Sequence, residues 1–187
     1  TITDGKGCTA TDNTNIVEPA VLSASMGIPS MVSCNGGNNG SITVTASGGT
    51  AATDYTYSWN TTPAQTTATA SNLVAGNYSV TISDDNNCTV AAGPINITEP
   101  TILSASIGAP TMVTCSGGNN GIATVTASGG TVATDYTYSW NTTPVQTTAT
   151  ASNLIVGNYT VIVTDDNGCT ANDDIVITEP TALAATM

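Results

Sequence analysis

The chain contains two similar copies of one segment, and this internal repeat constrains its fold more than any other feature of the sequence. Residues 19–88 match residues 100–169 at 52 of 70 positions, so that Trp59 of the first copy corresponds to Trp140 of the second. The period of about 80 residues exceeds the roughly 20 to 50 residues of solenoid units, which cannot bury a core alone. It is the size of a small independent domain. The sequence therefore predicts a string of folded modules.

Shorter pieces of the same repeat flank the two full copies. Residues 3–8 resemble residues 164–169, and a Glu-Pro pair stands at Glu18, at Glu99 and at Glu179. We interpret these pieces as parts of neighbouring repeats. The expected organisation is a C-terminal fragment of a preceding repeat at 1–18, complete repeats at 19–99 and 100–179, and the start of a following repeat at 180–187.

The charge of the chain excludes several classes of function. One basic residue, Lys6, stands against 13 acidic residues, and the formal net charge is −12. Binding to nucleic acid or to an anionic membrane needs cations that the chain lacks, so we expect neither partner. The sequence has no His, and without a general base near neutral pH we expect no enzyme. No apolar stretch of about 18 residues is present, and we expect no membrane insertion.

The hydrophobic pattern predicts an all-β fold. Apolar and β-branched residues alternate in short runs that are bounded by Gly, Asn, Asp and Pro, and no run follows helical spacing. Seven short strands in a module of this size are typical of an immunoglobulin-like β-sandwich. In the first copy the expected strands cover residues 20–26, 30–34, 41–47, 55–59, 66–70, 77–83 and 89–98.

Three residues favour immunoglobulin-like topology in particular. Pro29 interrupts the first long strand, which would let that strand cross from one sheet to the other, because Pro cannot donate to a central ladder. Trp59 lies on the expected third core strand, where such domains bury a Trp. Tyr78 follows a glycine turn and fits a tyrosine corner. The second copy repeats the last two features at Trp140 and Tyr159. The predicted architecture is tandem immunoglobulin-like modules.

Five motifs in order resemble a known family. They are Cys-Asn-Gly-Gly-Asn-Asn-Gly at 34–40, Ala-Ser-Gly-Gly-Thr at 46–50, Tyr-Thr-Tyr-Ser-Trp at 55–59, Gly-Asn-Tyr at 76–78 and Asp-Asp-Asn-Asn-Cys at 84–88. This combination resembles SprB repeats, the tandem modules of giant cell-surface adhesins in gliding bacteria. The resemblance implies export through a type IX secretion route and work as an extended extracellular filament. It names no ligand.

Two functions are compatible with these features. The first is structural: a shaft segment that holds an adhesive tip away from the cell or transmits force, with neighbouring repeats of the same chain as its partners. In the second, each module is itself a weak, multivalent binder of surface glycans or polymers, since repetition serves a ruler and a multivalent binder equally well. Lateral association with other filaments is a further expectation.

The cysteines predict a bond between modules. In immunoglobulin-like topology Cys34 enters the loop between strands A and B, and Cys88 leaves the loop between strands F and G, at the opposite end of the sandwich. That distance is roughly 25 Å, whereas bridged Cα atoms lie within about 7 Å. In a tandem array, the end of one module that carries the A–B loop faces the end of the next module that carries the F–G loop. The favoured pairing is therefore Cys34 with Cys169 across the junction, which leaves Cys8, Cys88 and Cys115 to pair with other repeats. Pairing within each repeat, Cys34 with Cys88 and Cys115 with Cys169, stays open, as do free thiols.

Acidic residues near the junction are candidate Ca²⁺ ligands. Calcium binds six to eight oxygens, and tandem extracellular modules can be stiffened in this way. The competing interpretation is an ordinary tight turn, because Asp, Asn and Gly are also the residues of such turns. The candidate ligands are Asp84 and Asp85, Asp165 and Asp166, together with Glu18 or Glu99.

Overall fold

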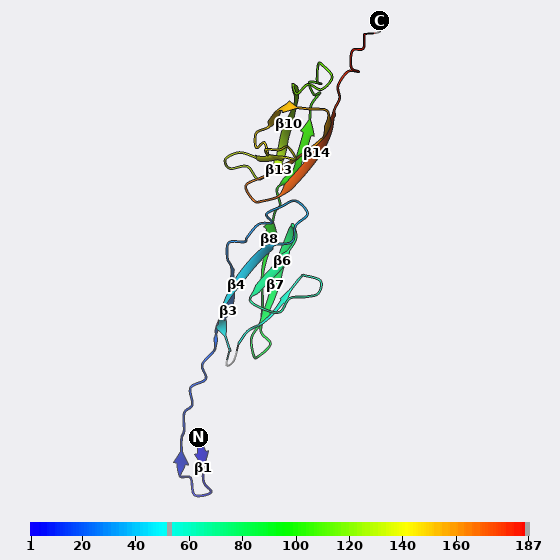
Figure 1. Ribbon diagram of the computed structural model, residues 1–187. Coiled ribbons are helices and arrows are strands. Elements are labelled where there is room, and N and C mark those ends of the chain that lie inside the picture. Colours follow the sequence, from blue (N-terminus) through cyan, green and yellow to red (C-terminus); the bar gives the residue numbers. More distant parts are fainter. Residues whose placement is uncertain (52–53, 186–187) are drawn as a thin grey trace.

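The computed structural model describes residues 1–51 and 54–185, which form two β-sandwich modules joined end to end (Figure 1). The two termini lie at opposite ends of the elongated molecule. Before the first module, β1 (Ile2–Thr3) and β2 (Thr9–Ala10) form a small separate hairpin. Within the described residues, no helix has the length and hydropathy that crossing a bilayer requires.

The first module consists of two three-stranded antiparallel sheets. One sheet has the order β3-β4-β6, and the other has the order β5-β7-β8. These orders correspond to the A-B-E and C-F-G sheets of an immunoglobulin-like sandwich. The strands are β3 (Ala20–Met26), β4 (Gly40–Gly49), β5 (Thr56–Trp59), β6 (Thr69–Leu73), β7 (Gly76–Ser83) and β8 (Thr89–Ile97).

The second module repeats this arrangement strand for strand. Its sheets have the orders β9-β10-β12 and β11-β13-β14. The strands are β9 (Thr101–Ile107), β10 (Gly121–Gly130), β11 (Thr137–Trp140), β12 (Thr150–Leu154), β13 (Gly157–Thr164) and β14 (Thr170–Ile177). The prediction of tandem immunoglobulin-like β-sandwiches is confirmed.

Each core is built around its single tryptophan. Trp59 is 2% exposed, and its Nε1 donates a hydrogen bond of 2.9 Å to the carbonyl of Thr67, which satisfies the buried polar atom. The hydroxyl of Tyr78 donates to the carbonyl of Val74 at 3.0 Å and so closes the expected tyrosine corner. The second module repeats these contacts from Trp140 to Thr148 and from Tyr159 to Ile155.

Two of the expected strands differ from the structure. Residues 30–34 form no ladder; Ser30 makes an isolated bridge with Ser41, and the amide of Val32 donates to the carbonyl of Thr98 beyond β8. This segment therefore crosses toward the other sheet without becoming a strand. The strand expected at 66–70 instead covers Thr69–Leu73, because the residues before it bond to the end of β5 through Trp59.

Candidate functional site

A disulfide joins the two modules. Cys34 lies in the loop between β3 and β4, and Cys169 lies in the turn between β13 and β14. Their sulfur atoms are 2.01 Å apart and their Cα atoms 5.7 Å apart. The structure thus contains the cross-junction pairing and not the pairing within each repeat. The thiols of Cys8, Cys88 and Cys115 are free and exposed.

The first module shapes its side of the joint through its own hydrogen bonds. The amide of Gly37 donates to the carbonyl of Cys34 at 2.9 Å, which forms a tight turn. The side chain of Asn39 fixes the residue before the cysteine: its Oδ1 accepts from the amide of Ser33 at 3.0 Å, and its Nδ2 donates to the hydroxyl of Ser33 at 2.7 Å. The loop therefore holds Cys34 in place independently of its partner.

Glu99 fixes the linker to this same loop. Its carboxylate accepts from the amide of Gly36 at 2.7 Å and from Nδ2 of Asn35 at 3.2 Å. Asn35 Nδ2 also donates to the carbonyl of Pro100 at 3.0 Å. Hydrogen bonds to a charged acceptor are about twice as strong as neutral ones. The direction in which the chain leaves the first module is thus set by a carboxylate on the linker.

The second module presents a turn built on Asp165. This carboxylate is 6% exposed, and it accepts from the amide of Thr131 at 2.8 Å, of Asn167 at 3.0 Å and of Cys169 at 2.9 Å. The hydrogen bond from Thr131, followed by those from Cys169 and Asn167, lowers the pKa of Asp165. The turn places Asn167 so that its Nδ2 donates across the junction to the carbonyl of Ser33 at 2.9 Å.

The acidic residues proposed as calcium ligands mostly serve as acceptors for the protein itself. Asp84 accepts from the amides of Thr50, Asn86 and Cys88, as Asp165 does in the second module. Asp166 accepts from Ala133 and Thr134, Glu99 holds the first module's loop, and Glu18 is exposed on the N-terminal extension. The structure shows the amide of Asp85 donating to the carbonyl of Thr50. Among the described residues, no three His, Cys, Asp or Glu side chains gather where they could hold a metal ion.

The sequence suggested Glu99 as a calcium ligand, whereas the structure shows that its carboxylate holds the cysteine loop of the first module. The signal was visible, because a Glu-Pro pair closes each copy of the repeat. The bonding partner of Glu99 could not be identified from the sequence, because Gly36 and Glu99 are 63 positions apart in the chain. Glu179 repeats the contact in the second module, where the amide of Gly117 donates to its carboxylate at 2.6 Å.

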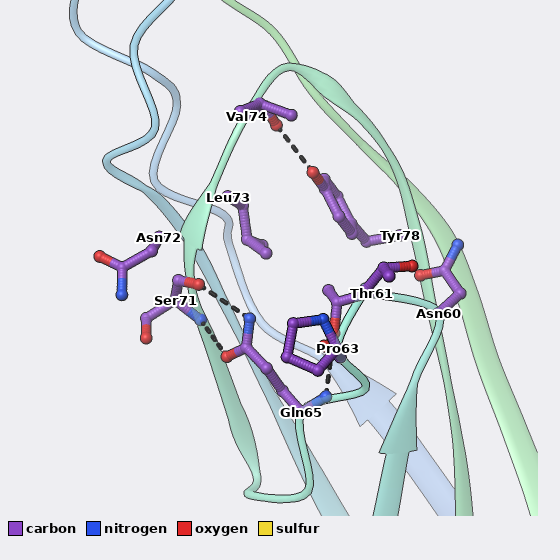
Figure 2. A pocket seen from close by; sticks show the side chains of 10 residues that line it. Asn60, Thr61, Pro63, Gln65, Ser71, Asn72, Leu73, Val74 and Tyr78 are labelled. Atoms are coloured by element: carbon purple, nitrogen blue, oxygen red, sulfur yellow. Dashed lines mark hydrogen bonds between the residues drawn. The ribbon is translucent and has the colours of Figure 1, made fainter.

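Each module also carries a hollow beside the tyrosine corner, and Figure 2 shows the one in the first module. Gln65 bonds to Ser71 through both ends of its side-chain amide: Oε1 accepts from the amide of Ser71 and Nε2 donates to its carbonyl, both at 2.9 Å. The Tyr78 hydroxyl is engaged with Val74. Asn72 points away from the hollow. The second module has the same hollow around Gln146, Ser152 and Tyr159, and most polar groups of both hollows are thus already paired.

Comparisons with solved structures return matches of low sequence identity. The three N-terminal domains of the highly immunogenic outer capsid protein of bacteriophage RB49 match with a TM-score of 0.47 and 20% identity, over 86% of this chain and 59% of that one. The C-terminal fragment of intimin, solved with the intimin-binding domain of its translocated receptor, matches at 0.42 and 14%, over 86% and 64%. The BSP domain of a biofilm-associated protein matches at 0.23 and 16%, over 84% and 30%. The chain therefore spans less than two thirds of each of these structures.

Comparison with protein families gives a more specific result. No match was found among curated proteins. The model of the SprB repeat matches residues 28–63 and residues 108–144, which are corresponding parts of the two modules. Each match begins shortly before the loop that carries Cys34 or Cys115 and ends after the buried tryptophan. Each of the two modules therefore contains a segment that matches the SprB repeat.

Proposed function

We propose that this chain is a shaft segment of a long extracellular filament, in which the repeats hold an adhesive region away from the cell surface. The observation that carries the proposal is the joint: two modules in line, linked by a disulfide from Cys34 to Cys169 as well as by the peptide. A shaft must transmit force and resist bending. Two covalent connections at different points of one interface oppose bending far better than one connection does.

The short linker supports the same function. Between the end of β8 and the start of β9 lie only Thr98, Glu99 and Pro100. Pro100 restricts the backbone, and the carboxylate of Glu99 is bonded to the first module at Gly36. A linker of this kind behaves as a stiff spacer instead of a flexible coil.

The location follows from the chemistry of the joint. Structural disulfides persist in oxidising surroundings, which are found outside the cell. The surface is polar but carries few ions, since charged residues make up 7% of the chain. The SprB match favours gliding motility and type IX secretion as the biological setting.

Glycan binding by every module is the competing function, and the repeated hollow would be its site. A sugar needs unpaired donors and acceptors, whereas Gln65 and Tyr78 spend theirs on Ser71 and Val74. These internal bonds use part of the hydrogen-bonding capacity that a ligand would need from the two side chains. This favours the shaft over the binding module.

Two measurements on the intact chain test the proposal. Small-angle scattering should give an elongated particle with both modules in line, and a glycan array probed with the labelled chain should show no binding above background. A compact particle would overturn the shaft. Strong glycan binding that is lost in Gln65→Ala/Gln146→Ala, with the disulfide intact, would move the function to the hollows.

A further inference from the structure

The joint between the modules is made of two different halves. One half is the loop between β3 and β4, which contributes the sulfur of Cys34 and the carbonyl of Ser33. The other half is the turn between β13 and β14, which contributes the sulfur of Cys169 and the Nδ2 of Asn167. Because each module contains one loop and one turn of this kind, each module carries both halves at opposite ends.

The loop half recurs at the far end of the second module without a partner. The amide of Gly118 donates to the carbonyl of Cys115 at 2.9 Å, the same distance as from Gly37 to Cys34. Asn120 Oδ1 accepts from the amide of Thr114 at 3.1 Å, as Asn39 does from Ser33 at 3.0 Å. This loop therefore has the shape that it adopts in the joint, and the Cys115 thiol on it is exposed.

The turn half recurs in the first module, again without a partner. Asp84 Oδ1 accepts from the amide of Asn86 at 3.0 Å and from that of Cys88 at 2.8 Å. In the joint, Asp165 makes the corresponding bonds at 3.0 Å and 2.9 Å. Asn86 occupies the position in the repeat that Asn167 has in the second module, where its side chain donates across the interface. The Cys88 thiol is exposed. Preorganised surfaces lose little entropy when they bind.

We infer that the loop around Cys115 is a docking surface for the Cys88-type turn of a further copy of this repeat, and that the turn around Cys88 docks on the Cys115-type loop of another copy. Every bond then runs from loop to turn, never from loop to loop or turn to turn. Each repeat is stapled to both neighbours, and the interfaces point in one direction along the array. A heterologous interface of this kind builds an open filament.

The bond forms by thiol–disulfide exchange with a small-molecule disulfide. The thiolate of one cysteine attacks that disulfide and releases one thiol. The second cysteine then attacks the mixed disulfide and releases the other, so that two protein thiols are oxidised and one small disulfide is reduced to two thiols. Both protein thiols are accessible for this chemistry.

One difference between the two cysteine loops weakens the joint that we infer at Cys115. Asn35, which donates to Glu99 and Pro100, is replaced by Ser116 in the second module. The shorter Ser side chain does not make these bonds in the structure, although Gly117 still donates to Glu179. The second joint therefore relies more on its sulfur bridge than the first.

The test is to extend the full chain by one repeat. A third copy of residues 100–179, in which one conservative substitution near each cysteine changes the mass of its peptides, is appended after residue 179. The protein is oxidised with glutathione disulfide, free thiols are alkylated, and the peptides are mapped without reduction. We expect Cys115 to be bonded to the turn cysteine of the added copy, Cys34 to stay bonded to Cys169, and Cys88 to be alkylated. An alkylated Cys115 beside an intact Cys34–Cys169 bridge would overturn the inference, as would a bond from Cys115 to Cys88.

Two controls show whether the site is specific. Replacing the turn cysteine of the added copy with Ser should return Cys115 to the alkylated form. Moving the thiol one position along the loop, with Cys115→Ser and Ser116→Cys, should slow bridge formation at least tenfold, and equal rates would mean that the loop is not preorganised. An elongated particle with a free Cys115 would reject this inference and leave the shaft proposal standing.

Discussion

At the scale of single residues, glycines in the Ser-Gly-Gly-Thr motifs allow the two sheets of each module to close around the acidic turn. Gly129 has φ +79°, and a Cβ placed there would overlap the backbone carbonyl of Ile102 on β9. At the next position, Gly130, a Cβ would lie 2.5 Å from Oδ2 of Asp165. The motif therefore supplies the space in which β9 and the carboxylate both approach β10.

Gly129→Ala separates this steric role from backbone strain when it is compared with Gly117→Ala. Gly117 has a similar φ of +77°, but no atom lies within 4 Å of the place that its Cβ would take. We expect Gly117→Ala to lower the free energy of unfolding by about 1 kcal/mol, the cost of a left-handed non-glycine residue. Gly129→Ala should cost about 3 kcal/mol, because overpacking adds to the strain. Chemical denaturation measures both, and equal losses would show that the close approach of β9 is not required.

The buried aspartates make stability depend on acid pH. Hydrogen bonds from backbone amides, with Thr50 first for Asp84 and Thr131 first for Asp165, lower the pKa of each carboxyl below its ordinary value. A lowered pKa means that the folded state favours the charged form, so this stabilisation is complete above the unfolded pKa of about 3.9. It is lost as the pH falls through that value toward the folded pKa.

We expect the melting temperature to change little from pH 7 to 5 and to fall steeply below about pH 4. Asp165→Asn should lower the melting temperature at pH 7 and flatten its dependence on acid, because one amide NH₂ would face a backbone donor. Asp12→Asn, on the exposed N-terminal extension, is the matched control and should leave the curve unchanged. Thermal melts followed by circular dichroism give the result. An Asp165→Asn curve that overlays the wild type would mean that the carboxylate does not stabilise the turn.

At the scale of elements, the loop between β3 and β4 and the linker form one unit. Glu99 reaches back to Gly36 and Asn35, so the exit of the first module and its cysteine loop are fixed together. Glu179 makes the same contact with Gly117 beyond the second module. This contact orients the linker without help from the disulfide.

Glu99→Gln should loosen this unit without unfolding either module. A Gln side chain has nearly the same size as Glu but lacks the negative charge that strengthens the hydrogen bond from the amide of Gly36. We expect the thiols of reduced Cys34 and Cys169 to re-form their bridge several-fold more slowly, with melting temperatures unchanged within about 2 °C. Glu18→Gln is the control, since the structure gives Glu18 no hydrogen bond to the residues that it describes. Identical reoxidation rates in wild type and Glu99→Gln would show that the linker is oriented by other contacts.

The sequence predicted most strands well, but it did not predict the crossing segment or the contact that fixes the linker. Alternation predicted β4, β7 and β8 closely because these strands bury one face, and Tyr78 marked its own corner. Pro29 marked the crossing between the sheets, but the sequence did not show that residues 30–34 cross without forming a strand, because their few hydrogen bonds go to Ser41 on β4 and to Thr98 beyond β8. The contact of Glu99 with Gly36 depends on a fold that brings distant positions together. Topology, by contrast, was enough to favour Cys34 and Cys169 as partners.

At the scale of the whole molecule, the two modules form a rod with one stapled joint (Figure 1). Cys34→Ser removes the staple and leaves the linker contacts in place. We expect small-angle scattering to show a wider distribution of shapes for this variant than for the wild type, with the fold of each module retained. Cys8→Ser, which removes an exposed free thiol from the N-terminal extension, is the matched control and should not change the scattering. A Cys34→Ser particle as straight as the wild type would show that the linker alone aligns the modules.

The disulfide also decides which part of the chain bears load. When the two ends are pulled, the shortest covalent path leaves the backbone at Cys34 and rejoins it at Cys169, which lie 135 positions apart. The strands between them, which carry both tryptophans, lie on a side branch outside this covalent path, whereas β3 and β14 remain in it. Fully stretched, this shielded branch would add about 450 Å to the length of the chain. In the oxidised molecule only the segments outside Cys34–Cys169, β3 and β14 among them, therefore bear load, and reduction of that single bond places the whole chain, with both tryptophans, under tension.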